Sequence, residues 1–142
     1  MSERLTGKCL CGACAFTAEP GDAAGVCHCG MCRKWTGGIN MAVQCKNVTW
    51  NDDAPLKAYR SSDWAERVFC GTCGSNLFWR AVDAPEGEQI LALMAFDEPE
   101  RFPVTSEIFI DEKLSTYALA GDTKKMTGAE VIAMFAAEVG EG

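Results

Sequence analysis

The sequence has no run that approaches the roughly 18 consecutive apolar residues a membrane span requires. Its first residues, Met1-Ser2-Glu3-Arg4-Leu5-Thr6-Gly7, also lack the apolar core of a secretory signal. From these two absences we expect a soluble, cytoplasmic protein with no membrane partner. In that reducing compartment, clustered thiols hold a metal more often than they form disulfides.

Basic residues are scarce as well. The chain carries 13 lysines and arginines against 20 acidic residues, a formal net charge of −7. Its two basic doublets, Arg33-Lys34 and Lys124-Lys125, do not amount to a basic patch, which argues against a nucleic-acid partner. No repeat, low-complexity tract or long linker divides the 142 residues, so we predict one domain over residues 1–142.

Cysteine, by contrast, is abundant. Nine cysteines fall into tight groups, and an odd number cannot pair off completely within one chain. Two groups share the spacing C-x-C-x2-C, a third is a C-x2-C knuckle, and Cys45 stands alone; the groups are Cys9, Cys11 and Cys14, then Cys27, Cys29 and Cys32, then Cys70 and Cys73. Closely spaced cysteines around a turn can place two or three sulfurs on one zinc ion.

The number of ligands leaves two arrangements open. A closed structural zinc site uses four thiolates, whereas a catalytic zinc keeps three protein ligands and an open fourth position. One site of each kind would use seven of the nine cysteines, and two closed sites would use eight. Counting alone does not decide between them.

Short β-favouring runs recur between turn signals and predict a mainly β protein. These runs are 14–17, 39–43, 48–50, 68–69, 77–79, 90–94 and 108–110. A short helical turn is expected at Met31–Trp35, ended by Gly37-Gly38.

A longer helix is expected near the C-terminus, at about residues 128–139. Thr127 and Glu130 have the spacing of a capping box, which marks a helix start. Apolar residues then recur at helical spacing, and we expect this face to pack on the core; its members are Val131, Ile132, Phe135, Ala136 and Val139.

Three segments together resemble one known family. Gly7–Ala13, Cys27–Lys34 and Arg67–Ser75 are similar, in order, to the motifs of the glutathione-dependent formaldehyde-activating enzyme (GFA) family, also called the centromere-protein-V-like family. The resemblance runs from about residue 7 to 110 and includes the stretch that ends at Asp97. It implies a β-tent, a fold in which short antiparallel sheets surround two zinc sites.

The resemblance also implies a division of the ligands. Four cysteines would hold a structural zinc, namely Cys9, Cys11, Cys70 and Cys73. Cys27, Cys29 and Cys32 would hold a second, catalytic zinc whose remaining position is open to solvent or a thiol. Cys14 and Cys45 are then interpreted as small core residues, and His28 as a residue that does not bind metal. Glu107 stands where the family often has a histidine.

The activity implied is that of a carbon–sulfur lyase. The enzyme would activate a small thiol such as glutathione at the open zinc, for addition to formaldehyde or a related aldehyde, or would catalyse the reverse reaction. One alternative is a non-catalytic zinc module for protein interaction. Another is an enzyme similar to the methionine sulfoxide reductases, but these need a further reactive cysteine, and no cysteine follows Cys73.

Overall fold

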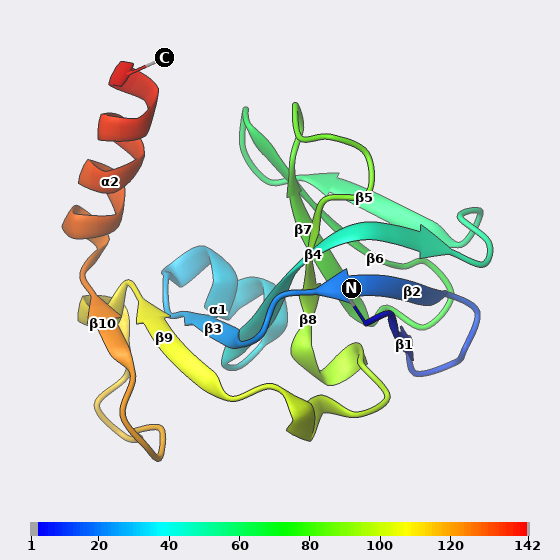
Figure 1. The fold of residues 1–142 in the computed structure, drawn as a ribbon, viewed down its shortest axis with the longest axis horizontal. Helices are drawn as coiled ribbons and strands as arrows, with labels where there is room; N and C mark the ends of the chain where they lie inside the picture. Colours follow the sequence, from blue (N-terminus) through cyan, green and yellow to red (C-terminus); the bar gives the residue numbers. More distant parts are fainter. Residues whose placement is uncertain (1–2, 142) are drawn as a thin grey trace. The chain divides into compact units, whose positions relative to one another are not determined.

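The computed structural model describes residues 3–141, with side chains as far as residue 136. The described chain forms ten β-strands, two α-helices and three short 3-10 helices (Figure 1). It divides into two compact units, each assembled from two separate stretches of sequence. These units do not test the prediction of a single domain, which stays a prediction.

The first unit consists of the residues up to Ala24 together with Ala42–Pro103. Its strands lie in the order β1-β2-β4-β8-β7-β6-β5, and the pairs between them are antiparallel. The strand bounds are β1 (Leu5–Lys8), β2 (Ala15–Pro20), β4 (Asn40–Trp50), β5 (Leu56–Arg60), β6 (Ala65–Cys70), β7 (Asn76–Ala81) and β8 (Gln89–Ala92). The short helices η1 (Leu93–Ala95) and η2 (Pro99–Arg101) follow β8.

Aromatic rings fill the core of this unit. The Phe16 ring contacts the rings of Trp50 and Phe96, with a distance of 5.1 Å between centroids in each pair. The Trp50 ring also contacts the Phe78 ring, at 5.6 Å between centroids. Such tilted and edge-on ring pairs add to the stabilisation from burial alone. Gly7 is needed beside them, because a Cβ there would lie 2.4 Å from the Phe16 ring and 2.3 Å from the Ala95 carbonyl oxygen. The core thus holds β1 in place just before the first cysteine group.

The second unit consists of Gly25–Met41 and Val104 onward. It contains β3 (Ala24–Cys27), α1 (Gly30–Thr36), β9 (Val104–Ile108), η3 (Ile110–Glu112), β10 (Lys124–Met126) and α2 (Gly128–Glu141). Strand β9 lies between β3 and β10, and its pair with β10 is parallel. Phe109 ends β9 with a left-handed backbone, φ 55°. The predicted strand 108–110 is therefore wrong beyond Ile108.

The predicted fold class is confirmed, since the structure is mainly β with a C-terminal helix and two cysteine clusters. The capping box is also present, because the Thr127 amide donates to Glu130 Oε1 at 2.9 Å and the Glu130 amide donates to Thr127 Oγ1 at 3.2 Å. Four strands that the sequence patterns missed are short: β1, β3, β5 and β10.

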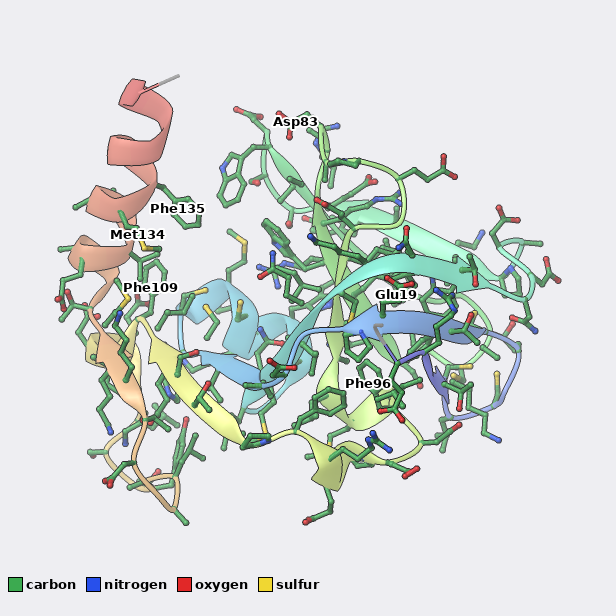
Figure 2. All side chains as sticks on the ribbon, in the orientation of Figure 1. Glu19, Asp83, Phe96, Phe109, Met134 and Phe135 are labelled. Carbon is green, nitrogen blue, oxygen red and sulfur yellow. The ribbon has the colours of Figure 1, made fainter. Side chains whose placement is uncertain are left out.

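The expected packing of α2 is only partly correct. Val131 is buried, but Ile132, Phe135 and Ala136 are exposed, so the prediction that this face is core is wrong for those three residues. Met134 and Phe135 both lie along this helix (Figure 2). The side chain of Val139 lies outside the described residues. Helical periodicity records which residues share a face, and it cannot record whether another element covers that face.

Candidate metal centres

The first cysteine cluster is built from two hairpin turns of the first unit. One turn joins β1 to β2, and the Cys9 amide donates to the Cys14 carbonyl there at 2.9 Å. The other joins β6 to β7, and the Cys70 amide donates to the Ser75 carbonyl at 2.9 Å. Each turn contains a glycine with positive φ, Gly12 at 84° and Gly74 at 83°, a conformation that glycine adopts without a steric penalty.

These turns bring four predicted ligands together. The sulfurs of Cys9, Cys11, Cys70 and Cys73 all lie within 4.8 Å of one another. The Cys11 sulfur lies 3.6 Å from that of Cys9 and 3.8 Å from that of Cys70. A tetrahedral zinc with Zn–S bonds of about 2.3 Å separates its sulfurs by about 3.8 Å, so this donor set fits one zinc ion.

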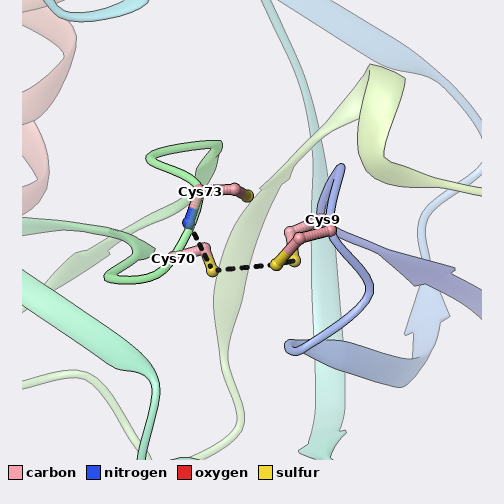
Figure 3. Close-up of side chains that lie close together, drawn as sticks. Cys9, Cys70 and Cys73 are labelled. Atoms are coloured by element: carbon pink, nitrogen blue, oxygen red, sulfur yellow. Dashed lines mark hydrogen bonds between the residues drawn. The ribbon is translucent and has the colours of Figure 1, made fainter.

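Backbone amides and a serine favour thiolates in this cluster. The Cys73 amide donates to Cys70 Sγ, as Figure 3 shows, and the Cys14 amide donates to Cys9 Sγ, both at 3.4 Å. Hydrogen bonds from the Ser75 hydroxyl and amide and from the Cys11 amide lower the pKa of Cys73 to about 5. The Ser75 hydroxyl also accepts from the Leu10 amide at 3.1 Å, so it connects the two turns. Metal ligation requires thiolates, and the contacts at Cys70 and Cys73 stabilise that form.

The second cluster lies in the second unit, where β3 leads into α1. Cys27 is the last residue of β3, Cys29 caps α1, and Cys32 lies in its first turn. The Cys32 amide donates to Cys29 Sγ at 3.3 Å, and the three sulfurs lie within 4.8 Å of one another. A hydrogen bond to the Cys32 side chain, followed by burial, raises the pKa of Cys27, and repulsion between neighbouring thiolates adds to the rise. A bound cation would relieve that repulsion, so this donor set also fits a metal ion.

The two clusters differ in the number of donors. Among the residues that the structure describes, no fourth cysteine, histidine or carboxylate joins Cys27, Cys29 and Cys32. His28 lies between two of these residues, but both of its ring nitrogens have other partners, the Glu107 carboxylate at 2.8 Å and the Tyr117 hydroxyl at 3.2 Å. The assignment of the seven cysteines as metal ligands stays a prediction.

Cys14 and Cys45 belong to neither cluster. Both side chains are fully buried, and burial raises the pKa of each thiol to about 12. A buried thiol with such a pKa stays protonated at neutral pH and behaves as a small apolar side chain.

We therefore expect Cys14→Ala and Cys45→Ala to leave the metal content unchanged. Each should lower the free energy of unfolding by about 1–2 kcal/mol, since a single sulfur atom is removed from a packed site. Metal analysis of the purified variants, together with urea unfolding, measures both quantities. Loss of one metal ion from Cys14→Ala would contradict the 4 + 3 division of ligands.

Sequence reasoning missed a set of hydrogen bonds around His28 in the second unit. Glu107, Tyr117 and Thr123 form one hydrogen-bonded group with His28, yet they come from β9 and the segment that follows it. The available signal was a charged residue, Glu107, directly before the β-favouring apolar run 108–110. Nothing in the spacing of the sequence marked Tyr117 or Thr123 as part of this group.

The fold and these clusters define a mainly β protein with two cysteine clusters that could each hold a metal ion. The chain belongs to the glutathione-dependent formaldehyde-activating enzyme family, whose model matches residues 4–112. An uncharacterised lyase of Schizosaccharomyces pombe is 32% identical over 130 residues, which cover 89% of this chain and 93% of that protein. Family membership and this relative support an enzyme of the lyase type.

A solved structure supports the fold. The crystal structure of a Rhodobacter sphaeroides protein matches with a TM-score of 0.54 and 25% identity, over 66% of this chain and 88% of that one. Within the described chain, no helix combines the length and the apolar composition needed to cross a membrane.

Proposed function

We propose that this protein is a zinc-dependent carbon–sulfur lyase that joins a small thiol such as glutathione to formaldehyde or a related aldehyde, and cleaves the product in reverse. The observation that carries the proposal is the difference in donor number between the clusters. Cys9, Cys11, Cys70 and Cys73 complete a four-thiolate set, which suits a structural ion. Cys27, Cys29 and Cys32 supply three, which leaves one position for a substrate.

The reaction itself is a simple addition. The thiol sulfur forms a bond to the aldehyde carbon, the carbon–oxygen π bond breaks, and the oxygen takes up one proton, so that a thiol and an aldehyde give a hemithioacetal. Zinc held by three thiolates would accept a soft fourth ligand and would lower the pKa of a thiol offered to it. The cysteines of the second cluster would hold and orient that ion.

Arg33 is suited to bind a carboxylate of the thiol substrate. It follows Cys32 directly, and its Nε donates to the His28 carbonyl oxygen at 3.0 Å, which anchors the guanidinium beside the second cluster. Among the described residues, no carboxylate forms an ion pair with Arg33. A guanidinium offers paired donors that match a carboxylate. Arg33 would therefore favour anionic thiols, of which glutathione is one.

Glutathione binding to the cobalt-substituted protein tests this function. We expect glutathione to strengthen the sulfur-to-metal charge-transfer absorption and to release about one proton per thiol bound near neutral pH, because the ligating form is the thiolate. Absorption spectroscopy and proton release in weakly buffered solution measure the two effects.

The controls separate the roles of individual residues. Cys29→Ser should abolish both signals. Arg33→Gln should raise the glutathione concentration needed for half-saturation by about tenfold, the loss expected for a hydrogen bond to a charged group, and Lys34→Gln, the neighbouring exposed cation, should not. If the spectrum is indifferent to glutathione, cysteine and other small thiols while both metals stay bound, the enzyme proposal fails and a non-catalytic interaction module replaces it.

A further inference from the structure

Both ring nitrogens of His28 have a hydrogen-bonding partner, although His28 lies between two proposed metal ligands in the sequence. It is 1% exposed, its Nε2 lies 2.8 Å from Glu107 Oε1, and its Nδ1 lies 3.2 Å from the Tyr117 hydroxyl. The same residue is fixed through its backbone, because its amide donates to the Ile108 carbonyl at 3.0 Å. The His28 backbone and ring therefore have little freedom to rotate.

Glu107 is the centre of this buried group. Its carboxylate is 3% exposed, Oε2 accepts from the Thr123 hydroxyl, and Lys125 Nζ lies 3.8 Å away. Burial by itself would raise the pKa of Glu107, but the hydrogen bonds from Thr123 and His28 hold that pKa below its ordinary value. A carboxylate oxygen can only accept, so the His28 Nε2 carries the hydrogen of its bond to Glu107 Oε1.

The geometry of the chain links this ring to the metal donors. Cys27 ends a β-strand and Cys29 has extended backbone angles, φ −61° and ψ 154°. In an extended chain, alternate side chains point to opposite sides. Cys27 and Cys29 thus share one side and His28 points to the other, so a rotation of the backbone at His28 would move the two sulfurs relative to each other.

A second attachment holds the next part of the loop. Glu112 Oε1 accepts from the Gly30 amide at 3.0 Å, so residues at and after the end of β9 fix the ligand loop at His28 and again at Gly30. Neither carboxylate belongs to the three-cysteine group. Their effect on the cluster must therefore pass through the residues between the cysteines.

We propose that Glu107 is a positioning residue for the second cluster: by fixing the His28 ring, it holds the sulfurs of Cys27 and Cys29 in one arrangement that suits a metal ion. The proposal rests on the metal site proposed above, and it adds a role for a residue that touches neither metal nor substrate. Partners that orient a metal site without binding the ion commonly change metal affinity by about 10–100-fold when they are replaced.

The test compares two substitutions of nearly equal size in the cobalt and zinc forms. Glu107→Leu removes the acceptor, whereas Glu107→Gln keeps an oxygen that can accept from His28 Nε2. For Glu107→Leu we expect the metal of the second cluster to pass to a chelator about tenfold faster or more, with a changed d–d absorption envelope for cobalt at that cluster. Glu107→Gln should restore most of the wild-type behaviour. The metal of the first cluster serves as the internal control and should be unaffected.

The outcomes distinguish this proposal from the proposed function. If Glu107→Leu folds and shows wild-type rates of metal release and wild-type spectra, the positioning role is overturned. If that variant does not fold, Thr123→Val and Tyr117→Phe take its place under the same criteria, because each removes one hydroxyl. If the wild-type protein binds no metal at the second cluster, the proposed function fails. The positioning role then depends on amide hydrogen exchange in the metal-free protein, where Glu107→Leu must accelerate exchange at His28 and Gly30, and unchanged exchange would refute it.

Discussion

Cys73→Ser is expected to unfold the protein, or to leave it with only a small part of its wild-type free energy of unfolding. The first cluster ties two hairpins whose cysteines are 59 positions apart, as for Cys11 and Cys70. Structural zinc contributes about 10–16 kcal/mol in small zinc domains, which is comparable to the roughly 5–15 kcal/mol by which native proteins are stable. A serine hydroxyl does not replace a thiolate as a zinc ligand.

Urea unfolding followed by circular dichroism, combined with metal analysis, measures this effect. The wild-type protein should carry close to two zinc ions per chain. Cys14→Ala is the matched control, because it removes a fully buried sulfur beside the other turn of the first cluster, and the 4 + 3 division leaves this sulfur outside the metal sites. If Cys73→Ser unfolds at the same urea concentration as the wild type, the structural role of the first cluster is wrong.

The second large effect is expected for Cys29→Ser, and it is a loss of catalysis rather than of stability. We expect this variant to stay folded, to retain one zinc ion, and to lose the acceleration of thiol addition to formaldehyde. Cys29 caps a helix of only seven residues and its cluster closes a six-residue loop, so less of the fold depends on it. Because a ligand itself is lost, the fall in rate should exceed the roughly 10–100-fold that follows loss of an outer partner.

Exchange spectroscopy by NMR measures this rate, since an enzyme changes the interconversion of thiol and hemithioacetal without changing their equilibrium. Cys45→Ala, which lies in the core of the first unit, is the control that should keep the wild-type rate. A wild-type rate in Cys29→Ser would refute catalysis at the second cluster. Equal destabilisation by Cys29→Ser and Cys73→Ser would overturn the assignment of structural and open sites.

Local spacing in the sequence determined a large part of the candidate sites. Cys9 and Cys11, or Cys70 and Cys73, lie within one turn of chain, and the glycines after them permit the backbone angles that the turns require. The same reasoning predicted a short helix at Met31–Trp35 ended by glycine. The structure has α1 there, at Gly30–Thr36, and Gly37 follows it with φ 72°. Hydrogen bonds between near neighbours depend on the local sequence alone, so their patterns can be read there.

Contacts between distant segments were decided only by the tertiary structure. His28 and Glu107 are 79 positions apart, and nothing in the spacing of either residue marks the other as its partner. The C-terminal helix gives the complementary case, since its capping box is correct while Ile132 and Phe135 are exposed. A capping box involves residues three positions apart, whereas burial depends on which elements the rest of the chain brings against a surface. The sequence therefore determined the turns that gather the cysteines, and tertiary packing decided which buried polar groups hold them in place.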